Sequence, residues 1–203
     1  MRTIAEWLDA ARQHGSLGAA ALDWQARERG GDPSIPLALM RERLRVMRES
    51  AQAGLSPTLR SVSGMVGGQA ALLAQAPFSS RFGLAGRAGV YALSIAEYNA
   101  CMGKIVAAPT AGSCGILPGA LLAAQEEAGF SDDELVMALF AAAAVGRVIA
   151  LQATISGAEG GCQAECGTAA GMAAAALAQL YGGTPDAAAH ACAFALMNML
   201  GLV

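Results

Sequence analysis

Residues 131–146 read Ser-Asp-Asp-Glu-Leu-Val-Met-Ala-Leu-Phe-Ala-Ala-Ala-Ala-Val-Gly, and this stretch decides the fold of the chain. Its first four residues form a capping box, in which a serine and a glutamate satisfy backbone groups where a helix begins. The apolar run that follows predicts a long buried helix. Because the run is shorter than the ~20 residues that a membrane span needs, and because Arg147 ends it, we expect a core helix and no membrane.

The composition of the whole chain agrees with this helix. The chain has 203 residues, of which 55% are hydrophobic, 14% are charged and 5% are aromatic, and 25 are glycines. These values exclude a disordered protein and suffice for a sizeable core. Small side chains in such numbers favour closely packed helices over a sheet sandwich. We therefore expect a mostly α protein. The net charge of −3 argues against a nucleic-acid partner.

Composition changes along the chain and suggests two parts. Residues 1–55 contain charged amphipathic segments and are interpreted as an N-terminal helical arm. Residues 56–203 are rich in alanine and glycine and are interpreted as a helical core whose glycine-rich loops line the functional site. The last residues, 197–203, are apolar. Since a natural terminus is usually solvated, we interpret the core as incomplete at its carboxyl end.

The cysteines and the first residues indicate a location. The amino terminus has no apolar signal-peptide core, and the number of cysteines is odd. Both features argue against a secreted disulfide framework, so we expect reduced thiols and a cytoplasmic protein. The cysteines are Cys101, Cys114, Cys162, Cys166 and Cys192.

Two glycine-containing segments carry polar groups suited to an anion. Residues 61–68 read Ser-Val-Ser-Gly-Met-Val-Gly-Gly, and residues 108–115 read Ala-Pro-Thr-Ala-Gly-Ser-Cys-Gly. Glycine permits close approach of the backbone, and free N–H groups before a helix attract carboxylates and phosphates. The alternatives are a flexible connector for the first segment and a tight turn with capping hydroxyls for the second. Spacing alone leaves both alternatives open.

A third segment, residues 156–167, combines glycines with two thiols. Cys162 follows a glycine pair at an expected helix start, where backbone dipoles stabilise a thiolate. Cys166 comes four residues later, so both thiols can face one side, but two cysteines do not make a zinc site. The alternative is that they are small buried hydrophobes. Lys104, the single lysine, is either a Schiff-base lysine for pyridoxal phosphate or an ordinary surface residue.

Together these segments resemble the alpha chain of the bacterial iron–sulfur L-serine dehydratase family. The resemblance extends over nearly the whole chain, is weakest in the first 50 residues, and implies a mostly helical fold. It rests on Ser63-Gly64 with Gly67-Gly68, Glu97-Tyr-Asn99-Ala-Cys-Met102-Gly103, Ala108-Pro-Thr-Ala-Gly-Ser113, Ser156-Gly-Ala-Glu-Gly-Gly-Cys-Gln-Ala-Glu165 and Asn198-Met-Leu-Gly-Leu-Val203.

The resemblance implies a [4Fe–4S] cluster held by three cysteines, with one iron open to the substrate. Cys162 matches the first of these ligands, whereas the other four cysteines match none. In the family the remaining two ligands follow soon after the motif at 198–203, so we expect them beyond residue 203. We accordingly expect these 203 residues by themselves to bind no stable cluster and to show little activity.

The implied reaction converts L-serine to pyruvate and ammonia, a step of amino-acid catabolism that serves gluconeogenesis. The resemblance and the anion argument together indicate a set of substrate-binding residues but no catalytic base. We expect a beta chain or a second copy as partner. The alternatives are a pyridoxal-phosphate lyase acting through Lys104 and a non-catalytic helical subunit. The expected substrate-binding residues are Ser63, Gly64, Asn99, Thr110, Ala111, Gly112 and Ser113.

Overall fold

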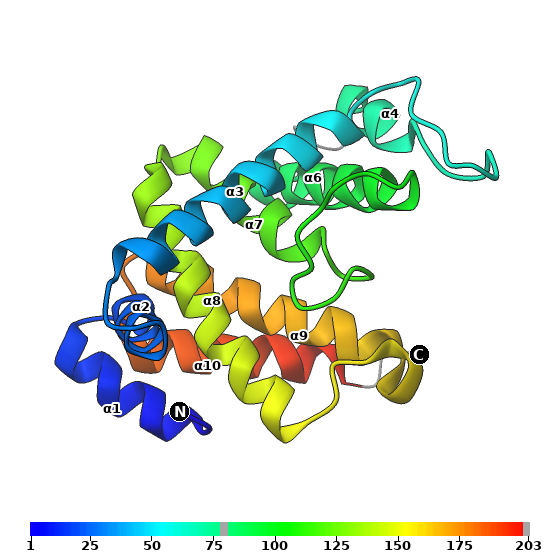
Figure 1. Ribbon diagram of the computed structural model, residues 1–203. Coiled ribbons are helices and arrows are strands. Elements are labelled where there is room, and N and C mark those ends of the chain that lie inside the picture. Colours follow the sequence, from blue (N-terminus) through cyan, green and yellow to red (C-terminus); the bar gives the residue numbers. More distant parts are fainter. Residues whose placement is uncertain (78–80, 201–203) are drawn as a thin grey trace. The chain divides into compact units, whose positions relative to one another are not determined.

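The computed structural model describes residues 1–77 and 81–200, and all regular structure in this part of the chain is helical (Figure 1). The expectation of a mostly α protein is therefore confirmed. The helices are α1 (Ile4–His14), α2 (Leu17–Glu28), α3 (Ser34–Gly54), α4 (Gln69–Gln75), α6 (Gly83–Ala100), α7 (Ile116–Ala128), α8 (Asp132–Gln152), α9 (Gly157–Leu180) and α10 (Pro185–Met199).

The contacts between residues divide the chain into two compact units. The first unit comprises Met1–Glu42 and Ser131–Val203, and the second comprises Arg43–Phe130. Helix α3 contributes to both. The division at residue 55, which composition suggests, stays a prediction.

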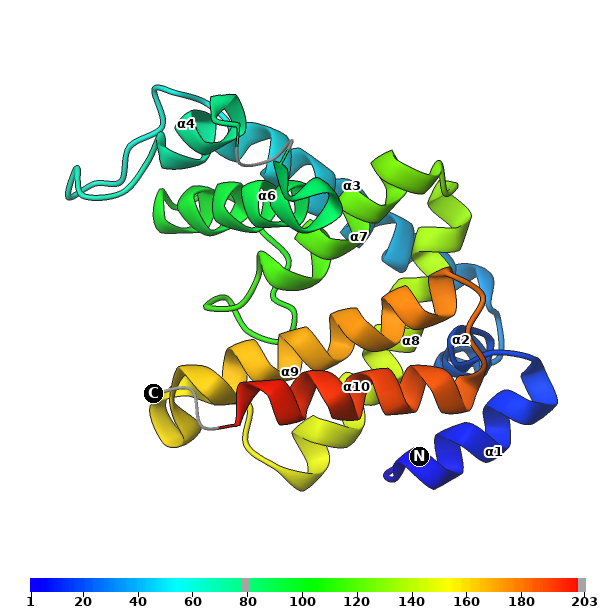
Figure 2. The ribbon, with the colours of Figure 1, turned by 180° about the vertical axis from the view of Figure 1, so that it is seen from behind.

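Helix α8 lies at the centre of the first unit, where it packs against α2 and α9. The predicted capping box is present, because the Ser131 hydroxyl accepts the Glu134 N–H at 3.3 Å and the Glu134 carboxylate accepts the Ser131 N–H at 2.8 Å. Leu135 and Phe140 are fully buried, as the apolar run predicts. Helices α9 and α10 run side by side (Figures 1 and 2).

With its polar ends included, α8 is long and apolar enough to cross a membrane, and half of its apolar window is buried inside the structure. Such a helix is weak evidence of a span, since core helices of soluble proteins have the same properties. Arg147 lies within α8, and its guanidinium carbon is 4.4 Å from the centre of the Trp24 ring. Its Nε also donates to the Met1 carbonyl at 3.1 Å. The absence of a membrane partner stays a prediction.

The second unit depends on close approach of helix backbones. A Cβ atom on Gly119 of α7 would lie 2.8 Å from the Ala88 carbonyl oxygen of α6, and one on Gly54 of α3 would overlap the Ser94 carbonyl. The short helix α4 packs on α6 and was not expected from the sequence. Because α4 directly follows the loop of residues 61–68, its packing on α6 brings the end of this loop to α6.

Three local expectations need correction or qualification. The glycines of residues 157–161 predict a break between two helices, whereas the structure has the break at residues 153–156, and α9 begins at Gly157 with a kink at Gly161, where φ is 71° and ψ is −177°. At the amino end, residues 3–6 (Thr-Ile-Ala-Glu) have the pattern of another capping box. Thr3 accepts the Glu6 N–H, but the Glu6 carboxylate accepts the Arg2 N–H, so this box is only half formed. Residues 201–203 of the final motif lie outside the described residues.

Candidate functional site

The carboxyl end of α6, together with its capping residue Cys101, contacts both of the predicted anion-binding segments. The Asn99 side-chain amide donates to the Ala111 carbonyl at 3.1 Å. The Cys101 thiol lies 4.0 Å from the Val66 carbonyl oxygen. One end of one helix thus joins residues 61–68 to residues 108–115 within the second unit.

Glu97, on the same turn, is a functional candidate that the sequence analysis did not single out. Its side chain is buried, with 1% of the residue exposed. The carboxylate accepts the backbone N–H of Gln69 at 3.1 Å and of Ala70 at 3.0 Å, the first two residues of α4. The available signal was a carboxylate at the start of the motif Glu97–Gly103, within the largely apolar sequence of α6, since such a group needs partners when it is buried.

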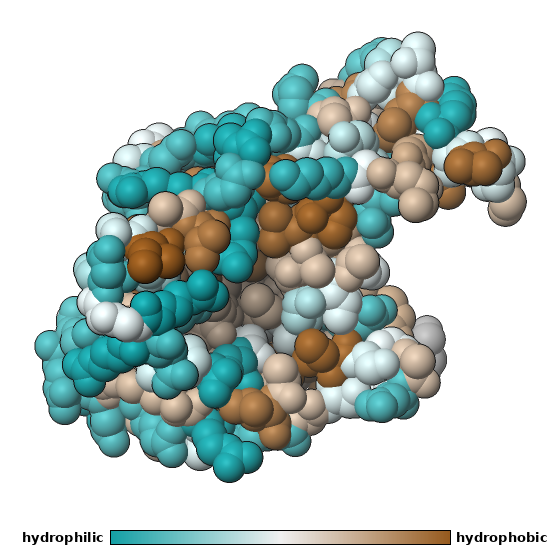
Figure 3. Space-filling view, in the orientation of Figure 1, coloured by the Kyte–Doolittle hydropathy of each residue, from teal (hydrophilic) through white to brown (hydrophobic). Residues whose placement is uncertain are grey.

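The glycine loop, residues 61–68, forms a closed turn with an exposed tip. The Ser61 N–H donates to the Val66 carbonyl at 2.8 Å, and the Ser61 and Ser63 hydroxyls lie 3.2 Å apart. Gly64, at the tip, has φ 75°, which only glycine adopts readily. Residues 62–65 at the tip are exposed, and Figure 3 shows polar and apolar residues together on the loop that projects after α3. Ser63 and Gly64 are therefore accessible to a ligand.

Residues 108–115 form the expected irregular segment before α7. The Thr110 and Ser113 hydroxyls lie 3.2 Å apart, and Ser113 is only 2% exposed. Ala111 and Gly112 are exposed beside them. The hydroxyl pair and the Asn99 bond constrain the shape of this segment around its exposed residues.

Cys162 and Cys166 lie together in the first unit. Their sulfur atoms are 3.4 Å apart, Cys162 is exposed, and Cys166 is half-buried. Burial, followed by the hydrogen bond with Cys162, raises the pKa of Cys166 to about 11. Gly161, with its positive φ, turns the backbone directly before Cys162 and leaves this thiol accessible.

All five cysteines are free, and burial raises the pKa of both Cys114 and Cys192. Buried neutral thiols are poor metal ligands, since the thiolate is the binding form. Within residues 1–77 and 81–200, no group of three or more His, Cys, Asp or Glu side chains is placed to hold a metal ion. Cys162 is accessible enough to be one ligand of a larger centre.

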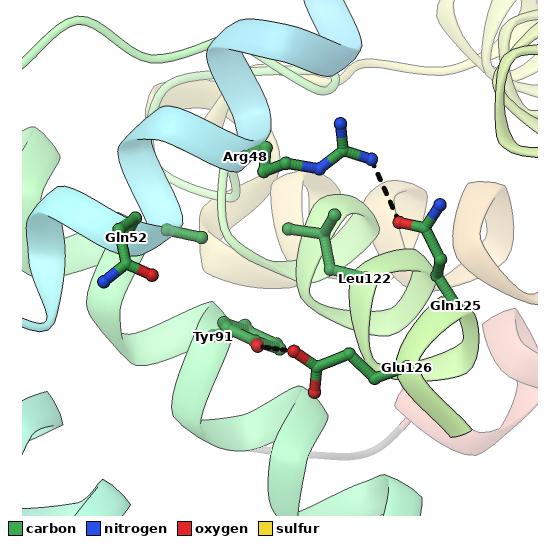
Figure 4. A pocket seen from close by; sticks show the side chains of 7 residues that line it. Arg48, Gln52, Tyr91, Leu122, Gln125 and Glu126 are labelled. Atoms are coloured by element: carbon green, nitrogen blue, oxygen red, sulfur yellow. Dashed lines mark hydrogen bonds between the residues drawn. The ribbon is translucent and has the colours of Figure 1, made fainter. Parts of the chain in front are cut away.

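A cavity of about 220 Å³ in the second unit contains none of the residues that the sequence singled out. The Arg48 guanidinium donates to the Gln125 side-chain oxygen at 3.0 Å, and the Tyr91 hydroxyl donates to the Glu126 carboxylate (Figure 4). These polar groups bind one another across the lining, so we assign no ligand to the cavity. Lys104 is exposed on the segment after α6.

Comparison with known proteins identifies relatives of the chain. Residues 25–203 match the family described as "Serine dehydratase alpha chain". The probable L-serine dehydratase alpha chain of Bacillus subtilis is 47% identical over 168 residues, which are 81% of this chain and 55% of the relative. The alpha chain from Peptoniphilus asaccharolyticus is 51% identical over 117 residues, or 58% of this chain and 40% of the relative. The chain thus spans about half the length of the curated relatives that it matches.

Proposed function

Because the chain belongs to the serine dehydratase alpha-chain family, we propose that it is the alpha chain of an enzyme that converts L-serine to pyruvate and ammonia. The observation that carries this proposal is the family match over residues 25–203, which includes all three glycine-containing segments. The contacts of the α6 end with two of these segments support the proposal, since one helix end joins both segments that contain the expected substrate-binding residues.

The proposed reaction begins with removal of the α-proton of L-serine by a base. The electron pair of that C–H bond forms a double bond between Cα and Cβ, and the β-hydroxyl leaves as water after taking up a proton. The resulting enamine tautomerises to an imine, and a second water hydrolyses the imine to pyruvate and ammonia. The overall change consumes no oxidant or reductant.

The chain's own residues bind and orient the substrate in this scheme. Ser63, Gly64 and residues 110–113 receive the carboxylate, and Asn99 contacts the amino or carboxylate group. Ser63, Gly64, Ala111 and Gly112 are exposed for this role. Ser113 is buried, and its hydroxyl lies against that of Thr110. Donors that are fixed before the substrate binds lose little freedom on binding. The Asn99 bond to Ala111 and the Thr110–Ser113 pair supply that fixation.

The proposed cofactor is a [4Fe–4S] cluster with Cys162 as one ligand. When bound, such a cluster supplies a Lewis-acid iron that polarises the β-hydroxyl. The exposed Cys162 thiol fits one position of its ligand set, but the described residues offer no complete set. The remaining thiolates would come from outside the described residues.

The assembly and setting follow the family. We propose a beta chain or a second copy as partner and the cytoplasm as location. A role in gluconeogenesis and amino-acid catabolism would follow from the products. The partner proposal fails if the isolated alpha chain is an active, cluster-loaded monomer.

The test is an assay of pyruvate formed from L-serine by the anaerobically purified enzyme. We expect pyruvate and ammonia in equal amounts, and loss of both in the Cys162→Ser variant. A pyridoxal-phosphate absorbance band that disappears in Lys104→Ala would contradict the proposal. Full activity of the Cys162→Ser assembly would contradict it as well.

A further inference from the structure

We propose that Glu97 is a positioning residue that fixes the glycine loop, residues 61–68, on the end of α6. It would thereby hold Ser63 and Gly64 where the substrate carboxylate binds. The role in substrate binding rests on the proposed function, whereas the attachment of the glycine loop by Glu97 does not.

The burial of Glu97 makes its two hydrogen bonds necessary. A carboxylate that is 1% exposed is costly unless each oxygen has a partner. The two oxygens accept the N–H groups of Gln69 and Ala70, which lie at the start of α4. The first N–H groups of a helix have no partner inside it and lie at the positive end of its dipole. Glu97 and the start of α4 therefore satisfy each other.

Arg60 holds the other side of the same loop. Its guanidinium donates to the Pro57 carbonyl at 3.2 Å and to the Gly67 carbonyl at 3.0 Å. Gly68, between Gly67 and α4, has φ 80°, and a Cβ there would lie 2.6 Å from an Arg60 nitrogen. The base of the loop is thus held by Arg60 and by Glu97, and its exposed tip lies between these two attachments.

Glu97 also lies close in the sequence to the residue that holds the second expected substrate-binding segment, residues 108–113. Asn99 lies two residues further along α6 and holds Ala111. Because Glu97 and Asn99 hold different segments, loss of the Glu97 bonds would loosen residues 61–68, which Arg60 still holds, while residues 108–113 stay attached through Asn99. Small displacements of positioning groups cost activity steeply, by about 100-fold for 1 Å.

The first measurement is amide hydrogen exchange in the purified enzyme carrying Glu97→Gln. The glutamine side chain keeps one acceptor oxygen and turns an NH₂ group toward the other N–H. We expect exchange across residues 61–70 to become about tenfold faster, since hydrogen bonds to charged groups are among the stronger ones. The matched control is Ser94→Ala, one turn earlier on α6, whose buried hydroxyl bonds within its own helix to the Tyr91 carbonyl. In Ser94→Ala, residues 61–70 should exchange at the wild-type rate.

Two hydrogen-exchange results would overturn the claim that Glu97 fixes the glycine loop. One is an unchanged rate over residues 61–70 in Glu97→Gln. The other is an equal increase in the buried part of α7, residues 121–124, which would mean that the variant loosens the whole unit. Glu97→Asp keeps the charge on a shorter side chain, and we expect its exchange rate to lie between those of the wild type and Glu97→Gln.

The second measurement separates positioning from stability by kinetics. We expect the KM for L-serine to rise about tenfold in Glu97→Gln while kcat changes less than about threefold, with partial recovery in Glu97→Asp. A loosened loop with a wild-type KM would overturn the link to substrate binding. A wild-type enzyme that forms no pyruvate would refute the proposed function instead, and the exchange data would still decide whether Glu97 fixes the loop.

Discussion

Cys162 and Cys166 lie with their sulfur atoms 3.4 Å apart, but their surroundings differ. Cys162 is exposed directly after the backbone turn at Gly161, whereas Cys166 lies on the regular part of α9 and is half-buried. Burial raises the pKa of Cys166 to about 11, so this thiol stays protonated near neutral pH. Of the two neighbours, Cys162 is therefore the one suited to a metal centre that approaches from solvent.

Tyr91 leads to a prediction about stability at alkaline pH. Burial, and then the hydrogen bond to Glu126, raises the pKa of Tyr91 to about 12 from its usual value of 10.0. A raised pKa in the folded state stabilises the protein fully below pH 10, and this contribution is lost as the pH rises through about 12. We expect Tyr91→Phe to lower the free energy of unfolding at pH 8. In this variant the free energy of unfolding should also fall less steeply between pH 10 and about pH 12.

Urea unfolding at a series of pH values measures this difference. Tyr181→Phe, at an exposed tyrosine of the first unit, is the control and should follow the wild-type curve. Parallel curves for the wild type and Tyr91→Phe above pH 10 would show that the Tyr91 bond does not contribute.

At the scale of elements, replacement by alanine should have opposite effects on stability at two helix glycines in the first unit. A Cβ on Gly18 of α2 would overlap the Met137 backbone of α8, which cannot move aside, whereas the atoms nearest to one on Gly146 of α8 belong to the flexible Met172 side chain. Replacing either glycine by alanine gains ~1 kcal/mol of helix propensity. We expect Gly18→Ala to lose about 1–3 kcal/mol of unfolding free energy and Gly146→Ala to be neutral or stabilising.

Thermal and urea unfolding of the two variants decide the matter, and each variant is the control for the other. Equal stabilities would mean that α2 can shift away from α8. The hydrogen bonds of Gln179 to the Gly18 N–H at 2.8 Å and to the Met137 carbonyl at 3.1 Å argue against such a shift.

Helices with strong local signals were predictable from the sequence, whereas α4 was not. The capping box and apolar run of α8 are contained within consecutive residues, and so is the Thr184–Pro185 start of α10. Helix α4 has seven residues, and its first N–H groups are satisfied by Glu97, which lies 27 residues from Ala70 in the sequence. No local sequence pattern predicts a hydrogen bond between residues so far apart in the sequence.

At the scale of the whole molecule, the sequence indicated which residues form the candidate site but not how they are held. The motifs at 61–68 and 108–113 were identifiable by their glycines and hydroxyls, yet the role of α6 in joining them depends on contacts across the fold. The ligand set of the proposed cluster was not predictable from spacing, since two thiols four residues apart fit several kinds of site. The family resemblance alone distinguished Cys162 from Cys166.

The most direct test of the proposed function is the iron and sulfide content of the enzyme reconstituted under anaerobic conditions. We predict about four irons and four sulfides per active site in the wild type, as for any [4Fe–4S] centre. Cys162→Ser should lose most of this content and Cys166→Ser should retain it. A Cys162→Ser enzyme with the wild-type iron and sulfide content would contradict the account.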